Sequence, residues 1–432
     1  MNKSSNIMKS TINIHTKYSI PNSYLANLPY KLRQITEKVI EHRIVKAPDI
    51  YEILFDKEIS LYDLCLSASA IRNSVKKNIV TFSPKIFVPL TQVCSDVCSY
   101  CTFREDPKSY DEIFLSKEYV LNLAHKANTL GCKEVLFTLG ERPERKFPLV
   151  KTWLNDHGFY STIEYLAYIS ELVATKTNLF PHGNPGTMTR NDMKILRNSN
   201  ISLGLMLENI SERLSEPGGP HEFAISKRPT ARLKTIVNAG KLQIPFTTGI
   251  LVGIGETKKE RIDSIFALQD INKEYGHIQE LIIQNFRAKE DIPMSRHPEP
   301  LISDFLWTIA ATRIIMGPYA NIQVPPNLNA GYYENFLGAG INDWGGISPL
   351  TIDYVNPEAP WPSIEQLYNK TLECGFELKP RLPIYPEFIT EKHLQFQNSE
   401  LLSEKIKSSV DDQGYVNGGM FNYVKVKNPT IA

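Results

Sequence analysis

The sequence has few cysteines, no excess of charge of either sign and no long apolar run. Only 6 of its 432 residues are cysteine, and its 48 basic side chains are balanced by 47 acidic ones. Because the charges balance, the composition indicates neither a basic surface that would bind nucleic acid nor an acidic tail. The longest apolar runs, such as IPFTTGILVGIG at 244–255, are too short and too rich in glycine to span a bilayer. We therefore expect no nucleic-acid partner and no membrane association.

The first residues show no targeting pattern. MNKSSNIMKSTINIHTKYSI at 1–20 lacks the apolar core of a secretory signal and the arginine of a transit peptide. We expect a cytoplasmic protein. Because thiols stay reduced in that compartment, a tight group of cysteines indicates a metal site or a catalytic site before it indicates a disulfide framework.

Changes of pattern divide the chain into four segments. Residues 1–25 are polar and are predicted to be disordered. Residues 26–79 carry apolar residues at helical spacing, which predicts a helical N-terminal extension. Residues 80–386 form the main domain, and 387–432 form a C-terminal extension or tail. With 42% apolar residues, the chain can bury a large core.

The main domain alternates short, β-branched runs with helical patterns. KIFVPLT, EVLFTLGE, ISLGLMLE and HIQELIIQNFRAK are examples of the predicted strands, and each is separated from the next by a helix-length stretch. About eight such units predict an α/β fold of the (β/α)8 TIM-barrel type, with functional groups at the carboxyl ends of the strands. An open, doubly wound sheet is the alternative.

Half of the cysteines stand in the single stretch CSDVCSYCTF, directly after the first predicted barrel strand. Cys94, Cys98 and Cys101 have the spacing C-x3-C-x2-C. A structural zinc site would need a fourth ligand from elsewhere, such as a distant histidine. A [4Fe–4S] cluster could instead be bound through three of its irons, leaving the fourth open to a small molecule. The other cysteines lie in apolar contexts typical of the core: Cys65, Cys132 and Cys374.

This cysteine loop resembles that of the radical S-adenosylmethionine (SAM) enzymes, which have an aromatic residue, here Tyr100, before the third cysteine. The resemblance implies a cluster whose open iron binds SAM. It also implies reductive cleavage of SAM to methionine and a 5′-deoxyadenosyl radical that abstracts hydrogen from the substrate. A low-potential electron donor is then a required partner. The protein contributes orientation, electrostatics and exclusion of water.

Later loops resemble the SAM-binding elements of this family. FTLGE matches a glycine–glutamate element that contacts the SAM amino group, and Gly140 and Glu141 carry the match, although Leu139 replaces the usual first glycine. Glu208, in LGLMLEN, is similar in placement to the carboxylate that binds the SAM ribose. A solvated loop charge is the alternative for Glu141.

Two further elements are similar to SAM-binding parts of the family. Arg232 would pair with the SAM carboxylate, as in biotin-synthase-like members; a place on the solvent face of its helix is the alternative. GILVGIGET resembles the glycine-rich element beside adenine, where Gly253 and Gly255 would let the backbone approach the ring.

Longer strings are similar to one subfamily. FTLGERPE, PHGNPGTM, EPGGPH, DWGGISPLTIDYVNPEAPWP and RLPIYP resemble the CofG component of 7,8-didemethyl-8-hydroxy-5-deazariboflavin (FO) synthase. The resemblance implies a lyase of coenzyme F420 biosynthesis. Its small-molecule substrate is 5-amino-5-(4-hydroxybenzyl)-6-(D-ribitylimino)-5,6-dihydrouracil, made by the pathway partner CofH, and it closes to FO with loss of ammonia.

Polar residues at other strand ends are candidates for substrate binding or catalysis. They are His182 and Asn184 in PHGNPG, and Gln284, Asn285 and Arg287 in IIQNFRAK. His182 is either a general base or a hydrogen-bonded core residue. Asn184 is either a ligand group or part of a turn.

Other functional classes stay open at this stage. A radical SAM enzyme with another substrate, of the CofH-like, biotin-synthase-like or menaquinone-pathway kind, is one alternative. A structural zinc-binding protein is the other.

Overall fold

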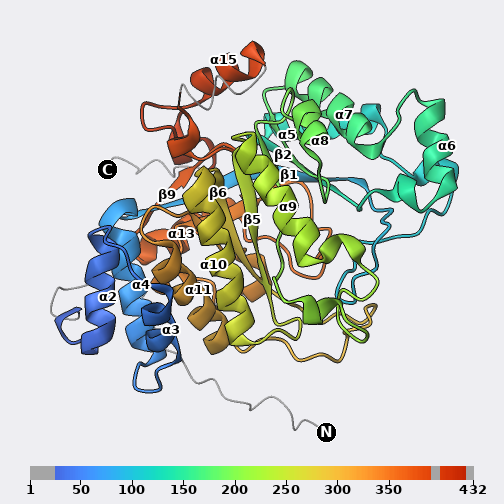
Figure 1. Cartoon of the computed structure of the whole chain (residues 1–432). Helices are drawn as coiled ribbons and strands as arrows, with labels where there is room; N and C mark the ends of the chain where they lie inside the picture. The colour runs from blue at the N-terminus through green and yellow to red at the C-terminus, as the bar shows by residue number, and fades with distance from the viewer. Residues whose placement is uncertain (1–24, 391–398, 425–432) are drawn as a thin grey trace, which may run out of the picture.

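The computed structural model describes residues 25–390 and 399–424, and it is shown in Figure 1. The predicted disordered segment 1–25 lies, except for its last residue, outside the described residues. The same is true of 391–398 and 425–432 in the predicted C-terminal extension.

Eight parallel strands form a closed barrel. The sheet order runs from β2 through β8 to β1, and β1 also pairs with β2, which closes the ring. The strands are β1 (Ile79–Thr91), β2 (Glu134–Leu139), β3 (Phe180–Asn184), β4 (Ser202–Gly204), β5 (Phe246–Val252), β6 (Ile278–Asn285), β7 (Ile322–Gln323) and β8 (Asp343–Ile347). The predicted TIM-type barrel is confirmed, and the open-sheet alternative is wrong.

Helices surround the barrel in the order that the alternating pattern predicts (Figure 1). They are α5 (Lys117–Thr129), α6 (Pro148–Asp156), α7 (Thr162–Lys176), α8 (Arg190–Leu196), α9 (Pro229–Lys241), α10 (Lys258–Tyr275), α11 (Ile302–Met316), α12 (Asn335–Gly338) and α13 (Ile364–Glu373). The sequence marks several of their starts. Thr189 and Asp192 form a reciprocal capping box at α8, and Thr257 and Glu260 form another at α10.

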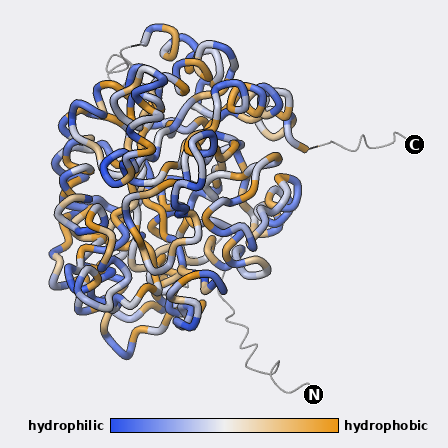
Figure 2. Tube along the Cα trace, turned by 90° about the vertical axis from the view of Figure 1, so that its right-hand side faces the viewer, coloured by the Kyte–Doolittle hydropathy of each residue, from blue (hydrophilic) through white to orange (hydrophobic). Residues whose placement is uncertain are grey.

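Three helices precede the barrel: α2 (Tyr30–Ile40), α3 (Ala47–Phe55) and α4 (Leu61–Lys76). Helix α4 packs beside α11, and Ser69 and Arg72 donate hydrogen bonds to backbone carbonyls of 337–341. Among the described residues, no helix is long and apolar enough to cross a membrane. Figure 2 shows hydrophobic and hydrophilic residues alternating along the trace in short runs.

The C-terminal part contains structure that the sequence analysis did not predict. Strand β9 (Glu377–Pro380) pairs in parallel with the start of β1, outside the barrel ring. Helix α15 (Glu400–Ser409) follows, shown in red in Figure 1. The prolines at 380, 383 and 386 argue against a strand here, because proline is depleted in strands and is confined to their edges and ends. For this reason β9 was not predicted.

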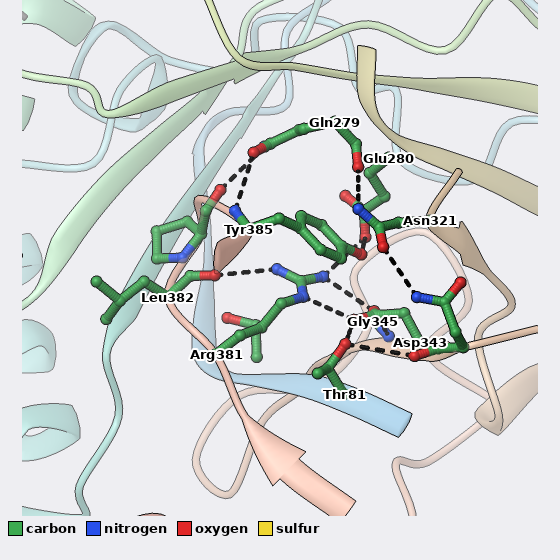
Figure 3. A network of polar contacts seen from close by, with 12 residues as sticks. Thr81, Gln279, Glu280, Asn321, Asp343, Gly345, Arg381, Leu382 and Tyr385 are labelled. Atoms are coloured by element: carbon green, nitrogen blue, oxygen red, sulfur yellow. Dashed lines mark hydrogen bonds and ion pairs between the residues drawn. The ribbon is translucent and has the colours of Figure 1, made fainter. Parts of the chain in front are cut away.

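An ion-pair network closes the end of the barrel opposite the cysteines (Figure 3). Arg381 follows β9, and its guanidinium donates to Asp343 of β8 at 2.6 and 2.9 Å and to Glu280 of β6 at 2.8 Å. The Tyr385 hydroxyl donates to Glu280 at 3.0 Å. Arg381 is 2% exposed and Asp343 is fully buried, so the C-terminal segment closes this end of the barrel with buried, paired charges.

Candidate active site

The three clustered cysteines lie on the loop that follows β1, at the carboxyl end of the barrel. All three are free thiols; Cys98 is buried, and Cys94 and Cys101 are partly buried. The loop is fixed from two sides. Ser95 N–H donates to the carbonyl of Glu141 at 2.9 Å, and Val97 N–H donates to that of Phe223 at 2.9 Å.

The surroundings of the thiols favour their neutral form in the absence of a metal. Burial raises the pKa of Cys98 to about 12, although Lys227 acts in the opposite direction. Burial also raises the pKa of Cys94, while the backbone N–H of Glu141, which donates to its sulfur at 3.1 Å, opposes the rise. A metal that binds here must displace these protons, so binding becomes stronger as pH rises.

The donor set fits a multinuclear cluster better than a single ion. Cys94, Cys98 and Cys101 line one cavity of about 250 Å³. Yet within 25–390 and 399–424 no three His, Cys, Asp or Glu side chains are grouped so that they could hold one metal ion. A cluster spreads its ligands over several irons, so its thiolates need not converge on one point.

The same cavity brings most of the predicted site residues together. Besides the cysteines, its lining includes Tyr100, Gly140, Glu141, Asn184, Glu208, Arg232, Gln284, Asn285 and Arg287. These residues come from the ends of β1 to β4 and of β6, and from α9, as expected where the carboxyl ends of barrel strands meet.

Glu141 links two loops at the cavity wall. Its carboxylate accepts hydrogen bonds from the backbone N–H of Thr187, at 2.9 Å, and from the Thr187 hydroxyl. Its side chain is buried at 7% residue exposure, so it is not the solvated loop charge that was the alternative. A Cβ on Gly140 would lie 2.0 Å from the carbonyl oxygen of Val93, so only glycine allows this approach.

Glu208 carries a negative charge on the cavity wall. Burial acts to raise its pKa, but Lys227 and Arg232 outweigh burial and hold the pKa below its usual value. Lys227 forms an ion pair with the carboxylate. Glu208 has φ +64°, a left-handed conformation that is rare outside glycine and is common at functional sites.

Arg232 is also buried, at 4% exposure, so its alternative on the solvent face of α9 is wrong. It donates to the carbonyl oxygens of Ser226 at 2.9 Å and of Met206 at 3.2 Å. The Tyr100 hydroxyl lies 2.9 Å from Nε2 of His221, whose pKa is lowered by burial to about 3. Tyr100 and Arg232 are therefore held in place by protein partners.

Gly253 and Gly255 do not line the cysteine cavity. They have φ +97° and +104° and form a turn after β5, in which Gly253 N–H donates to Glu256 at 2.8 Å. A Cβ on Gly253 would lie 2.6 Å from Pro300, so packing in the turn accounts for this glycine. Leu251 of β5 is the nearby residue that does line the cavity.

His182 lies in a second cavity, deeper in the barrel, of about 180 Å³. Asn184 and Gln284 line both cavities, so they mark the passage between the cysteines and the barrel interior. Asn285 accepts a hydrogen bond from Asn329 at 2.7 Å. Arg287 forms a half-exposed ion pair with Glu299 at 3.1 Å, at the rim.

Several residues at these cavities were missed by the sequence analysis. They are Lys85, Glu134, Lys227, Glu280 and Arg381. Three of them offered a signal, because Lys85, Glu134 and Glu280 are charges within otherwise apolar predicted strands. Lys227 lies in a loop, where no periodicity marks its direction.

The fold and the site together define a TIM barrel with three free cysteines at a cavity at the carboxyl end of its strands. A family model for the radical SAM superfamily matches residues 88–268. The 7,8-didemethyl-8-hydroxy-5-deazariboflavin synthase of Methanopyrus kandleri is 48% identical over 336 residues, which are 78% of this chain and 99% of that protein. The chain belongs to the radical SAM superfamily and, within it, to the family of these synthases.

Two other relatives agree with this assignment. The synthase of the same name from Methanocaldococcus jannaschii is 43% identical over 84% of this chain and 98% of its own length. The FO synthase of Streptomyces coelicolor is 46% identical over 83% of this chain, which matches only 42% of that longer protein.

Solved structures show the same fold at low identity. Methylornithine synthase PylB has a TM-score of 0.62 at 19% identity and covers 80% of this chain and 97% of its own. The hydrogenase maturase HydG from Carboxydothermus hydrogenoformans has a TM-score of 0.66 at 18% identity, covering 89% and 90%. Family membership implies a [4Fe–4S] cluster and SAM as cofactors, and the three-thiol cavity fits them.

Proposed function

We propose that this protein converts 5-amino-5-(4-hydroxybenzyl)-6-(D-ribitylimino)-5,6-dihydrouracil and SAM to FO in coenzyme F420 biosynthesis. Ammonia, methionine and 5′-deoxyadenosine are the other products. The observation that carries the proposal is the match over nearly the full length of two deazariboflavin synthases, with the three cysteines at the cavity. A CofH protein supplies the substrate, and a low-potential donor supplies electrons.

The cysteine loop is the cofactor site in this proposal. Cys94, Cys98 and Cys101 would hold three irons of the cluster and leave one iron without a protein ligand, available to SAM. When bound, the cluster supplies the single electron that reductive cleavage of SAM requires. The support is that all three thiols line one cavity and that no fourth cysteine lines it.

Charged side chains around this cavity suit the zwitterionic SAM. Glu208 is an ionised acceptor for ribose hydroxyls, and Arg232 is a cation for the SAM carboxylate. Glu141 holds the cysteine loop against the loop after β3 through Ser95 and Thr187, and its carboxylate, which lines the cavity, would accept a hydrogen bond from the SAM amino group. Lys227 offsets the charge of Glu208 until a ligand binds.

Anaerobic reconstitution with iron and sulfide tests this function. We expect about four irons per chain and release of 5′-deoxyadenosine that depends on SAM and reductant. Fluorescent FO should appear when the adduct is supplied. Colourless protein with one zinc per chain would contradict the cofactor assignment, and SAM cleavage without FO would contradict the substrate.

A further inference from the structure

The cavity inside the barrel is layered along the strands. On β2 it is lined by Glu134, Leu136 and Thr138, and on β6 by Glu280, Ile282 and Gln284. Side chains on one face of a strand are two residues apart, so successive layers are about 6–7 Å apart. β1 pairs Lys85 with Glu134 and Phe87 with Leu136, so these two strands share their levels, whereas β3 pairs His182 with Leu136 because the strands of a closed barrel are staggered.

A cluster of charged and polar side chains lines this cavity, which is unusual for a barrel core. Lys85, Glu134, His182 and Glu280 are 8, 1, 5 and 7% exposed, yet all four line the cavity. The interior of such barrels is normally filled by branched apolar side chains. A polar layer costs free energy unless its members bind each other or a ligand, so this departure from the packing rule indicates function. We call these four residues the barrel floor.

The ammonium of Lys85 makes fewer hydrogen bonds than it can donate. Its ammonium donates to Glu134 at 2.8 Å, and this is the one hydrogen bond it makes to the residues that the structure describes. An ammonium has three donors. Gly346 on β8 makes room for the side chain, since a Cβ there would lie 2.1 Å from Cε of Lys85. The remaining donors are available to a ligand in the cavity.

His182 supplies a matching acceptor. The Ser202 hydroxyl has one proton, which it donates to the carbonyl of Pro383 at 2.7 Å. Nδ1 of His182, 2.6 Å from the same hydroxyl, must therefore be the donor in that contact. Nε2 then carries a lone pair, and no described residue donates to it. Burial lowers the pKa of His182 to about 4, which keeps the ring neutral at pH 7.

Below the floor, Arg381 fixes the carboxylate of Glu280 in place (Figure 3). Its guanidinium binds Glu280 at 2.8 Å from one side, while the Thr247 hydroxyl donates to the other carboxylate oxygen at 2.8 Å. Glu280 is thus oriented by protein groups but still lines the cavity.

Two residues further along β1, β2 and β6, at Phe87, Leu136 and Ile282, the cavity wall is apolar, and we call this part the apolar layer. The rings of Phe87 and Trp361 lie parallel, 5.0 Å apart with an interplanar angle of 8°. Beside these residues, Gln323, which pairs with Ile282, and the Trp361 Nε1–H, which has no hydrogen-bond partner among the described residues, offer a few polar contacts. Flat rings with polar edges suit such a space better than a chain of hydroxyl groups does.

Building on the proposed function, we propose that the barrel floor binds the ribityl chain of the substrate and that the two substrate rings lie in the apolar layer. The reacting part of the substrate must be near the cysteine cavity, so the unreactive chain is the part that reaches the floor. Each hydroxyl both donates and accepts. The ammonium of Lys85 and the acceptors of His182, Glu134 and Glu280 meet both needs.

The test compares two adducts on the cluster-loaded wild-type protein: the ribityl adduct and an analogue with an n-pentyl chain in its place. We expect the pentyl adduct to bind on the order of 100-fold more weakly, because it leaves buried polar groups unpaired. Equal dissociation constants would overturn the placement. FO-type turnover of both adducts at equal kcat/KM would overturn it as well, while leaving the proposed function intact.

A double variant tests whether the barrel floor is the part of the protein that binds the ribityl chain. Lys85→Met with Glu134→Gln removes both charges without changing the net charge. It should bind the ribityl adduct about 100-fold more weakly and the pentyl adduct as wild type does, with unchanged iron content. Lys133→Met, adjacent in sequence but outside the cavity lining, is the matched control. If the folded double variant still prefers the ribityl adduct by the wild-type factor, the chain binds elsewhere and the proposal is wrong.

Discussion

Replacing Arg381 with methionine tests how the barrel is closed. The substitution removes a guanidinium that is 2% exposed and leaves Asp343 and Glu280, both buried, without their cation. Breaking a buried ion pair from one side costs about 3–5 kcal/mol, since the remaining charge is no longer compensated. The methionine fills most of the vacated volume, so the electrostatic part dominates. We expect a loss of about this size in the free energy of unfolding at pH 7.5, measured by urea denaturation.

The pH dependence of that loss identifies its cause. Burial and the nearby Asp343 already raise the pKa of Glu280 despite Arg381, and removal of Arg381 raises it further. A carboxyl whose pKa is higher in the folded state than in the unfolded state destabilises the fold at high pH. This destabilisation disappears as pH falls through the folded-state pKa. The variant should therefore lose less stability at pH 5.5 than at pH 7.5.

Lys379→Met provides the control for this comparison. Lys379 lies two residues earlier on β9, and its ion pair with Glu377 is 3.6 Å long with a carboxylate that is 55% exposed. Such a pair contributes about 1 kcal/mol or less. If Arg381→Met lowers the free energy of unfolding no more than this control does, or lowers it equally at both pH values, the Arg381 network does not stabilise this end of the barrel.

Three further outcomes are expected. Cys98→Ala should abolish cluster assembly, whereas Cys132→Ala should keep its iron because that thiol lies in the core. Iron analysis and electron paramagnetic resonance measure the outcome. Full iron content in both variants would contradict the ligand assignment. Glu208→Ala should weaken SAM binding at least about 10-fold with unchanged iron content, by loss of a charged acceptor. The exposed Glu212→Ala is its control, and equal SAM dissociation constants in the two variants would remove Glu208 from the site. Iron uptake by the apoprotein should be weaker at pH 6.5 than at pH 8.5, since the raised pKa of Cys94 and Cys98 makes protons compete with iron; pH-independent affinity would contradict this.

The barrel and the cysteine site were predictable for one physical reason. Parallel strands separated by helices leave a periodic pattern in the sequence, and the loops after their carboxyl ends share one face of a barrel. Cys94, Glu141 and Glu208 are far apart in the chain, but each lies at or just after the end of a predicted strand. The topology alone therefore places them around one cavity.

The barrel floor was not predictable in the same way. Lys85, Glu134 and Glu280 appear in the sequence as isolated charges in apolar strands, and no local rule says which face of the strand they occupy. Their pairing depends on the register between strands and on Arg381, which is about 100 to 300 residues away in the sequence. The close packing of Gly253 depends likewise on Pro300, a distant packing partner.

The register of β6 links the floor to the cysteine cavity. Glu280, Ile282 and Gln284 are alternate residues on one strand, so their side chains point to the same face of β6. They lie at the barrel floor, in the apolar layer and at the passage to the cysteine cavity, respectively. A strand cannot slip by one residue without turning all three side chains out of the cavity. Arg381 fixes Glu280, and thereby the height of Gln284 below the cysteines. The C-terminal segment that closes the far end of the barrel is therefore connected, through Arg381 and β6, to Gln284, which lines both cavities.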